Sequence, residues 1–545
     1  MLQFQDKVAL ITGSGTGIGM TVAKKFVENG ASVIILGRRK EPLENTSKML
    51  QEIINEKNTS AFVKIFSGVD VSDEKAITDM FDTIQNENIS VDVVVNNAGV
   101  SGPVTCFAHA PLDDFRSTVD IHLTGTFWTS VQALKVMKEG SKIITISTFF
   151  AEERPLEQRP YRFRSPYTAS QGAKNRLVEA MSWELTEKGI VSIGTNPGPV
   201  HSDRIYKTVY PKAASEFLRV SGFEELSPVE VETANNEILG LLGEDDVTVK
   251  AGIRSAAEKL GKQETTLTNL LNKVQSIAEK IQKNTSTMIP DQQFLSQDQV
   301  ATTVLTLAGD EQSKILNGKI IPGDRVFYPV KSHITSSVPQ IEKNNFEGIK
   351  CIITSDDSDD AIQKANSLKL MLEKNNAQVI DSDAESTNVL FIHITGNVPE
   401  FSKLTELTRN EWDALVDKFI NKPAQVAQNA MKSFIPCGSD DPRLFKDAYG
   451  RIIIIGPDLP AGKKVSGHER AKVEVFRGAL RPFATTVNQE LSDVLKSNVR
   501  MFVVLPGTVD GKESNNENII NTINYLVTKE AGVSSEVIFC PDESR

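Results

Sequence analysis

A glycine-rich turn between a strand-like run and a helix-like run constrains the fold of this chain more than any other feature. Residues 7–11 are mostly apolar, residues 12–19 carry the glycines, and residues 20–27 have a helix-like pattern. In this order the three segments form a loop that binds the pyrophosphate of a dinucleotide at the helix N-terminus. A glycine-rich loop alone is often an ordinary turn, but this context favours a dinucleotide site. Its expected residues are Thr12, Gly13, Ser14, Gly17, Ile18 and Gly19.

The residues after the second expected strand bear on the choice of dinucleotide. Residues 32–36 are apolar and are followed by Gly37, Arg38 and Arg39. An acidic residue here would hold a ribose 2′-hydroxyl, whereas an arginine accommodates a 2′-phosphate. We therefore expect NADPH/NADP, with Arg38 paired to the phosphate and Arg39 beside it. The alternative is a solvated pair of arginines at the start of a helix.

Three further motifs follow the glycine loop in a specific order. Asp70-Val71 closes a third expected strand, Asn96-Asn97-Ala98-Gly99 ends a fourth at residues 91–95, and Pro197-Gly198-Pro199-Val200 follows a sixth. Together with the glycine loop, they resemble the short-chain dehydrogenase/reductase family over roughly residues 5–330. The resemblance implies cofactor contacts from Asp70, Val71, Asn97, Ala98, Gly99, Pro197 and Gly198.

The family's catalytic tyrosine aligns with Tyr167, but its lysine four residues later is replaced by Gln171. In the family the lysine binds the nicotinamide ribose and its charge promotes ionisation of the tyrosine. Gln171 is able to bind the ribose but carries no charge. Lys174 lies about two turns from Tyr167 on the same face of the expected helix and is the alternative cation.

Two more positions depart from the family pattern. The catalytic serine aligns best with Thr148, with Ser147 beside it, and either hydroxyl would hydrogen-bond a substrate carbonyl oxygen. His122 stands where the family has an asparagine that relays protons through water. A histidine also relays protons. The alternative is an ordinary histidine at the edge of the core.

Length and composition indicate a soluble protein of two domains. The chain has 545 residues, which is longer than a domain with a single hydrophobic core usually is. Of these residues, 39% are hydrophobic and 24% charged, as is usual for a soluble globular protein. A net charge of −11 disfavours nucleic acid and acidic membranes as partners. No apolar run approaches the ~18 residues of a membrane helix, no signal peptide is visible, and the four cysteines show no metal spacing. We expect a cytoplasmic homo-oligomer that uses a small-molecule or CoA-thioester substrate.

The second half of the chain is an eroded copy of the first. Residues 348–354, 388–392 and 451–455 echo the first, fourth and fifth strands, and Gln489-Glu490-Leu491 echoes Trp183-Glu184-Leu185. The expected phosphate loop instead holds four carboxylates, on Asp356, Asp357, Asp359 and Asp360, which would repel phosphate. Val473 and Arg477 stand in place of the tyrosine and lysine. We interpret this half as structural; the alternative is a degenerate second site.

These observations predict an α/β fold with two tandem doubly wound parallel-sheet (Rossmann-like) domains. Residues 1–330 form the NADPH-binding domain, residues 331–346 a linker and residues 347–545 the degenerate domain. Residues 200–298 form a helical insert in the first domain. Its apolar periodicity is carried by Leu260, Leu267, Leu270, Leu271, Val274, Ile277 and Ile281. The helices bury one face against each other, cap the substrate cleft, or do both.

The tandem arrangement resembles the bifunctional malonyl-CoA reductases, whose halves each pair an active short-chain reductase domain with a degenerate one. The carrying residues are 147–150, the insertion up to Tyr167, and 197–204, which are most similar to the acyl-CoA-reducing half. The resemblance implies that NADPH reduces malonyl-CoA to malonate semialdehyde and free CoA, with Tyr167 as hydrogen-bond or proton donor. Arg204 would pair with the substrate carboxylate, or alternatively with Asp203 or a helix end.

Two other functions remain open at this stage. One is reduction of malonate semialdehyde or another carbonyl by the same site. The other is a cofactor-binding subunit or scaffold whose catalysis is impaired by Gln171.

Overall fold

The computed structural model describes most of the chain. The described residues are 2–151, 162–202, 205–224, 226–287, 289–324, 344–380, 389–436, 439, 441–459, 467–506, 516–528 and 537–540.

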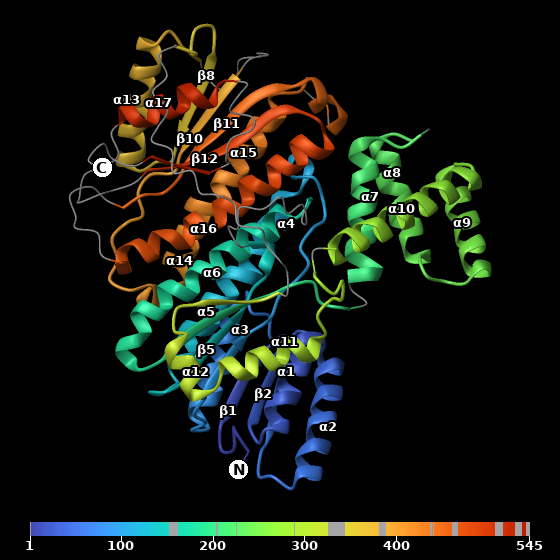
Figure 1. The fold of residues 1–545 in the computed structure, drawn as a ribbon, viewed down its shortest axis with the longest axis vertical. Coiled ribbons are helices and arrows are strands. Elements are labelled where there is room, and N and C mark those ends of the chain that lie inside the picture. The colour runs from blue at the N-terminus through green and yellow to red at the C-terminus, as the bar shows by residue number, and fades with distance from the viewer. Residues whose placement is uncertain are drawn as a thin grey trace.

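The N-terminal part folds into a seven-stranded parallel sheet in the order β3-β2-β1-β4-β5-β6-β7 (Figure 1). The strands are β1 (Val8–Thr12), β2 (Ser32–Gly37), β3 (Val63–Ser67), β4 (Val93–Asn96), β5 (Lys142–Ile146), β6 (Val191–Pro197) and β7 (Ile320–Gly323). The chain runs outward to β3 and then returns to β4 beside β1. In such sheets the crevice at the carboxyl ends of these central strands binds ligands.

Helices cover both faces of this sheet, so its central strands are buried on both sides and rich in Val and Ile. Phe26, Leu43 and Val304 belong to the core on one face, and Phe81 and Phe127 to the core on the other. The helices are α1 (Gly17–Glu28), α2 (Lys40–Lys57), α3 (Glu74–Asn86), α4 (Leu112–Val119), α5 (Gly125–Ala133), α6 (Ser165–Leu185), α11 (Gln297–Leu307) and α12 (Asp310–Ile315).

A second, six-stranded parallel sheet has the order β13-β12-β11-β10-β8-β9. Its strands are β8 (Lys350–Ser355), β9 (Gln378–Val379), β10 (Val389–Ile394), β11 (Tyr449–Ile455), β12 (Asn498–Pro506) and β13 (Val537–Cys540). The helices of this part are α13 (Asp359–Lys374), α14 (Arg409–Val416), α15 (Lys422–Lys432), α16 (Gly467–Gln489) and α17 (Asn516–Leu526). The predicted fold class, with two tandem doubly wound sheets, is confirmed.

The second sheet repeats the strand order of the first but leaves out one portion. In the first sheet, β2 and β4 are separated by α2, β3 and α3, whereas only residues 380–388 separate β9 from β10. That interval is too short for two helices and a strand. The second part therefore lacks the portion that carries Asp70 and Val71 in the first.

The position of Asp70-Val71 differs from the sequence prediction, and most of the predicted linker lies outside the described residues. Asp70-Val71 does not close the third strand, because β3 ends at Ser67 and the pair lies in the following turn. The turn is held by Asp70, whose carboxylate accepts hydrogen bonds from the backbone N–H and the hydroxyl of Ser72. The expected linker, residues 331–346, lies outside the described residues except for its last three.

The segment after β6 forms a helical lobe beside the first sheet, drawn in green in Figure 1. It contains α7 (Tyr210–Ser221), α8 (Pro228–Ile238), α9 (Asp246–Leu260) and α10 (Glu264–Ser286). Leu218, Ile253, Leu267 and Leu270 are among the buried residues of a core that belongs to the lobe itself. The helical periodicity of residues 260–281 is thus explained by packing within the lobe.

The two sheets are joined through a close crossing of α6 and α16. Gly172 and Gly478 face each other, and a methyl group built on Gly172 would overlap the carbonyl oxygen of Gly478. Beside the crossing, the Phe127 ring stacks on Trp412 with centroids 3.7 Å apart. The Trp412 indole N–H donates to the hydroxyl of Thr124 at 3.1 Å. The two parts therefore share one continuous buried core.

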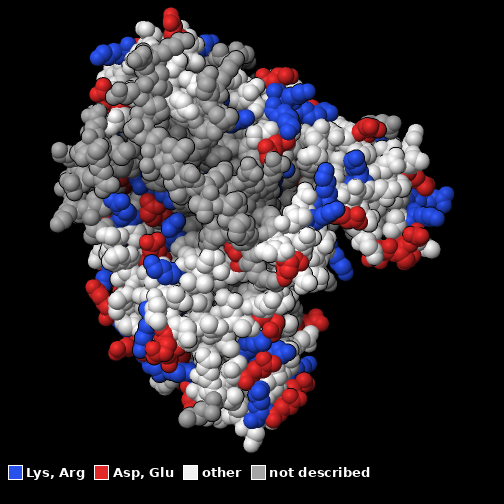
Figure 2. All heavy atoms as spheres, in the orientation of Figure 1, with Lys and Arg blue, Asp and Glu red and all other residues white. Residues whose placement is uncertain are grey.

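The described surface carries both signs of charge. Figure 2 shows Lys and Arg interspersed with Asp and Glu on the described part of one face, without a continuous basic band. Within the described residues, none of the helices combines the length and the apolar character needed to cross a membrane.

The glycine crossing generates a stability prediction. Gly172→Ala should lower the free energy of unfolding by about 1–3 kcal/mol, because the added methyl group forces α6 and α16 apart. Urea denaturation measures the change. Gly240→Ala is the control, since a methyl group there meets no atom within 4 Å. Equal stability of the two variants would contradict a tight crossing.

Candidate active site

The turn between β1 and α1 has the conformation and spacing that only glycine permits. Gly13 and Gly17 have φ values of 67° and 64°, in the left-handed region that favours glycine. A Cβ atom on Gly13 would lie 2.9 Å from the Cα atom of Ala98, and one on Gly19 would lie 2.5 Å from the carbonyl oxygen of Gly13. Side chains on Gly13 and Gly19 would therefore collide with Ala98 and with the turn itself.

Three polar residues predicted to bind cofactor hold this turn in place, Thr12 and Asn97 against the end of β4 and Ser14 against β1 and β2. The Thr12 hydroxyl accepts hydrogen bonds from the backbone N–H groups of Asn97 and Ala98, each at 2.9 Å. The Asn97 amide donates to the carbonyl oxygen of Thr12 at 3.0 Å, and the Ser14 hydroxyl donates to that of Ile11 at 2.9 Å. Their side chains thus shape the crevice by holding its walls.

A cavity of about 290 Å³ lies at the carboxyl ends of the central strands. Seven of the residues predicted from the cofactor motifs line it: Gly13, Arg38, Arg39, Asp70, Val71, Ala98 and Gly99. The other eight predicted residues do not line it; besides Thr12, Ser14, Gly17, Gly19 and Asn97 in the turn and at the end of β4, these are Ile18, Pro197 and Gly198. Ile18 packs partly against the core, Pro197 ends β6, and Gly198 lies against the backbone of Asp324.

Arg38 has a protein partner in this structure. A guanidinium nitrogen of Arg38 lies 3.5 Å from a carboxylate oxygen of Asp70, and the Arg38 side chain is 61% exposed. An exposed pair of this kind contributes little to stability. Arg38 is therefore available to an anionic ligand entering the cavity.

Tyr167, in the first turn of α6, is contacted by a histidine and an arginine. The His122 ring meets it edge-to-face with centroids 5.2 Å apart. The guanidinium carbon of Arg164 lies 4.1 Å from the centre of the Tyr167 ring. Arg164 is 5% exposed and also donates to the carbonyl oxygen of Ser101 at 2.5 Å. A buried positive charge therefore lies beside the tyrosine although Gln171 has none.

Arg164 was not predicted from the sequence. It lies in the insertion before Tyr167, where no family motif guides the alignment. The spacing of Arg164 and Tyr167 in the sequence indicates their contact. Arg164 is the N-cap residue of α6, and residues three apart at the start of a helix lie on one face.

The environment of His122 explains the glycine at position 99. The ring nitrogen Nε2 of His122 lies 2.9 Å from the carbonyl oxygen and 3.3 Å from the amide nitrogen of Val100. A Cβ atom on Gly99 would overlap the imidazole ring. His122 lies in a π-helical turn, Asp120–Thr124, and such turns are frequent at functional sites. The histidine thus connects the Gly99–Val100 segment to Tyr167.

Ser147, Thr148 and Gln171 meet at the carboxyl end of β5, and all three are buried. The Ser147 hydroxyl lies within hydrogen-bonding distance of two oxygens of Gln171, the side-chain oxygen at 3.3 Å and the backbone oxygen at 3.2 Å. Thr148 follows directly on the same strand end. The glutamine thus orients Ser147.

Lys174 lies deeper in the protein than Gln171. It is 1% exposed, and its ammonium group donates to the carbonyl oxygen of Ile146 at 2.8 Å. Burial lowers the pKa of Lys174 to about 7. The Tyr167 ring, by contrast, is contacted by Arg164 and His122. Arg204, the predicted substrate ligand, lies outside the described residues.

The corresponding edge of the second sheet is occupied by ion pairs. Asp356, after β8, lies 2.9 Å from the Lys418 ammonium and 3.4 Å from that of Lys422. Arg477, in place of the family lysine, donates to the carbonyl oxygens of Pro457 and Pro506 at 2.7 and 2.6 Å. These side chains bind each other and the strand ends.

Lys174 makes stability depend on pH. Its pKa is 10.5 when unperturbed and about 7 in the folded protein, so between these values the unfolded state binds the extra proton. Stability from this group therefore rises with pH across that window. Lys174→Met removes the titration. The Lys174→Met variant should therefore have a higher free energy of unfolding than the wild type. The difference should be largest near pH 7 and shrink toward pH 10.5, and urea denaturation at several pH values measures it. A difference that stays constant with pH would contradict the lowered pKa.

Comparison with known proteins shows similarity to oxidoreductases. The family model for short chain dehydrogenases matches residues 7–210. A 3alpha-hydroxysteroid dehydrogenase of Mediterraneibacter gnavus is 31% identical over 206 residues, which cover 37% of this chain and 78% of that protein. An uncharacterized oxidoreductase of Bacillus subtilis is 28% identical over 267 residues, which cover 46% of this chain and 93% of that protein.

Two solved structures match nearly the whole chain. The C-domain of a bacterial malonyl-CoA reductase with NADP superposes with a TM-score of 0.71 at 16% identity, over 98% of this chain and 99% of that one. The N-domain with NADP gives a TM-score of 0.68 at 15% identity, over 99% and 98% of the two chains. At these identities the match establishes the tandem fold. The 31% identity over most of a dehydrogenase, with the glycine loop and Tyr167 in place, shows that the chain belongs to the short-chain dehydrogenase family of oxidoreductases.

Proposed function

We propose that the chain is an NADPH-dependent reductase of an acyl-CoA, and that malonyl-CoA is converted to malonate semialdehyde. NADPH and a proton would be consumed and NADP⁺ and free CoA released. The observation that carries the proposal is the position of Tyr167, on the same sheet edge as the cavity and beside a buried cation. The likeness to both NADP-containing domains of malonyl-CoA reductase supports this choice of substrate.

The residues around the cavity fit NADPH. The glycine turn offers the N-terminus of α1 to the pyrophosphate. Gly13 lines the cavity, and a Cβ atom on it would collide with Ala98 at the end of β4. Arg38 would exchange its contact with Asp70 for the 2′-phosphate, with Arg39 nearby. When bound, the cofactor supplies the hydride.

The chain's own residues would handle the proton and the developing oxyanion. Tyr167 donates a proton or hydrogen bond to the carbonyl oxygen. Thr148 donates a second hydrogen bond, or Ser147 does so once its single hydroxyl proton turns away from Gln171. Gln171 holds the Ser147 hydroxyl. Arg164 supplies a positive charge at the ring of Tyr167, where the family's lysine charge is missing. His122 connects the tyrosine to the Val100 backbone.

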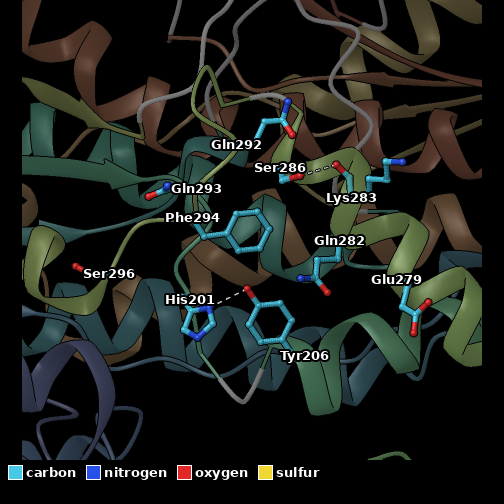
Figure 3. A pocket seen from close by; sticks show the side chains of 10 residues that line it. All are labelled: His201, Tyr206, Glu279, Gln282, Lys283, Ser286, Gln292, Gln293, Phe294 and Ser296. Atoms are coloured by element: carbon cyan, nitrogen blue, oxygen red, sulfur yellow. Dashed lines mark hydrogen bonds between the residues drawn. The ribbon is translucent and has the colours of Figure 1, made fainter.

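A second, larger cavity is proposed to hold the CoA arm. Its volume is about 720 Å³, and it lies between α10 and the strand-like segment that contains Phe294 (Figure 3). His201 lines it and is four residues beyond Pro197, hence within about 14 Å of the sheet edge. Tyr206 and Phe294 offer parallel ring planes with centroids 6.2 Å apart.

Polar groups of this second cavity suit the polar parts of a CoA arm. The side-chain amides of Gln282 and Gln293 match its amides, and Lys283 matches its phosphates. In Figure 3 Tyr206, Phe294 and Gln282 extend toward the same space. The lobe would then cap the substrate while its helices also form a core of their own.

The substrate is tested by following NADPH oxidation with malonyl-CoA and malonate semialdehyde side by side. Reduction of malonyl-CoA with release of a free thiol supports the proposal. Reduction of the semialdehyde alone indicates the aldehyde reductase. NADPH binding without turnover on either compound indicates a catalytically impaired subunit, which the engagement of uncharged Gln171 with Ser147 would explain.

Tyr167→Phe should abolish turnover and leave NADPH binding intact, because the hydroxyl serves the chemistry and the ring still packs between Arg164 and His122. Steady-state kinetics and a fluorescence titration with NADPH measure the two properties. Undiminished turnover by this variant would remove Tyr167 from the mechanism.

Arg38→Asp should weaken NADPH binding by about 1.5–3 kcal/mol, because it deletes a charged contact with the 2′-phosphate. NADH, which lacks that phosphate, should bind nearly unchanged. Calorimetric titration with both cofactors measures the difference, and Lys40→Asp, on an exposed neighbour, controls for net charge. Equal loss for both cofactors would contradict the role of Arg38.

A further inference from the structure

The segment that leads into α6 has a strained backbone. Phe163 has a φ of 70° and is 3% exposed. A bulky residue rarely adopts this left-handed conformation, and it persists only where surrounding contacts enforce it. The next residue is Arg164, whose guanidinium lies over Tyr167. The contacts that fix the backbone of Phe163 therefore also fix the position of the Cα atom of Arg164, from which its side chain extends.

The contacts that hold Phe163 come largely from the second half of the chain. The Phe163 N–H donates to a carboxylate oxygen of Glu490 at 2.7 Å, and its carbonyl oxygen accepts from Thr105 N–H at 2.9 Å. The preceding residue, Arg162, is paired with Asp493 at 2.5 Å. Glu490 and Asp493 both lie in the turn Glu490–Val494, directly after α16.

The second oxygen of Glu490 binds a different backbone segment. It accepts the Phe107 N–H at 2.8 Å. Phe107 ends the segment that starts at Gly99 and includes Ser101, whose carbonyl oxygen accepts a hydrogen bond from Arg164. One buried carboxylate thus ties together the two backbone segments between which the arginine is held.

We propose that Glu490 is a positioning residue for the active site: through Phe163 and Phe107 it fixes Arg164 against Tyr167. The second part of the chain then contributes to catalysis although its own ligand edge is filled. The effect on turnover rests on the proposed reductase function, whereas the effect on the backbone does not.

The chain contains a matched control. Glu184, at the far end of α6, accepts the N–H groups of Leu404 and Thr405 at 2.6 and 2.9 Å. It is buried like Glu490 and bonds the other half of the chain in the same way. It lies 17 residues after Tyr167, about 25 Å along the helix. Loss of either carboxylate removes two hydrogen bonds to backbone N–H groups of the other half and one side-chain contact across the same interface, to His468 at 3.2 Å from Glu184 and to Cys106 from Glu490. Only Glu490 binds the residue next to Arg164.

Glutamine is a suitable replacement because Glu490 occupies a dry site. Burial raises the pKa of Glu490 to about 8. The ionisable groups near it are Cys106, Glu216, Arg219, Arg162 and Asp493, and Arg219 is held by Glu216 in two hydrogen bonds. Glutamine keeps the size of the side chain and accepts one N–H, but its own NH₂ group faces the second N–H.

The test compares Glu490→Gln with Glu184→Gln in the full-length chain. We measure kcat with whichever of malonyl-CoA and malonate semialdehyde the wild type reduces, NADPH affinity, thermal stability, and hydrogen exchange of a peptide spanning residues 162–170. Glu490→Gln should lower kcat on the order of 10- to 100-fold, with NADPH affinity unchanged and stability equal to that of Glu184→Gln. Exchange over residues 162–170 should accelerate in Glu490→Gln only.

Equal kcat in the two variants, or equal exchange over residues 162–170, would overturn the proposal. If the wild type reduces neither compound, the reductase function fails, and the exchange comparison alone decides the role of Glu490. If Glu490→Gln does not fold, Glu490→Asp replaces it, since the shorter side chain retracts both oxygens. The same loss of kcat and the same exchange pattern are then expected, and their absence overturns the proposal.

Discussion

The close approach of α6 and α16 at Gly172 and Gly478 is the contact on which the rest of the structure depends. With no side chain on either residue, the helix backbones touch, and each helix brings its ends within reach of the other half of the chain. The end of α6 delivers Glu184 to Leu404 and Thr405, and the turn after α16 delivers Glu490 to Phe107 and Phe163. The reciprocal hydrogen bonds follow from the geometry of one crossing.

The importance of this crossing explains which parts of the first sheet have a counterpart in the second and which do not. The strands and helices that build the crossing are present, because without them the first sheet would expose the apolar side of α5 and α6. The portion between β9 and β10 that would build a ligand edge is reduced to residues 380–388. At the remaining edge, Asp356 binds two lysines of its own half. The interface is constrained by the packing of the two halves, whereas the described side chains at this edge bind one another.

Much of the first sheet was predictable because its signals are local. Strand, glycine turn and helix follow each other within residues 8–28. Arg38, Asp70 and Gly99, which the motifs assign to the cofactor, line one cavity. The sequence predicts a strand end at Asp70, because the turn that Ser72 stabilises is not visible as a pattern. Glu490 was recognised as the counterpart of Glu184. Its partners were not predictable, because they lie 383 and 327 residues away in the chain.

The electrostatics of Tyr167 show why a single replaced residue was a poor guide to this site. The sequence places an uncharged glutamine where a lysine is usual, and Lys174 is too deeply buried to contact the tyrosine ring as Arg164 does. The positive charge comes instead from Arg164, a residue that precedes the helix. A guanidinium suits this position because it stacks flat on an aromatic face and remains charged when buried. Stacking, however, depends on orientation, so the backbone before Arg164 must be fixed. The strained Phe163 and the carboxylate that holds it satisfy this requirement, which links the charge at the tyrosine to the packing of the two halves of the chain.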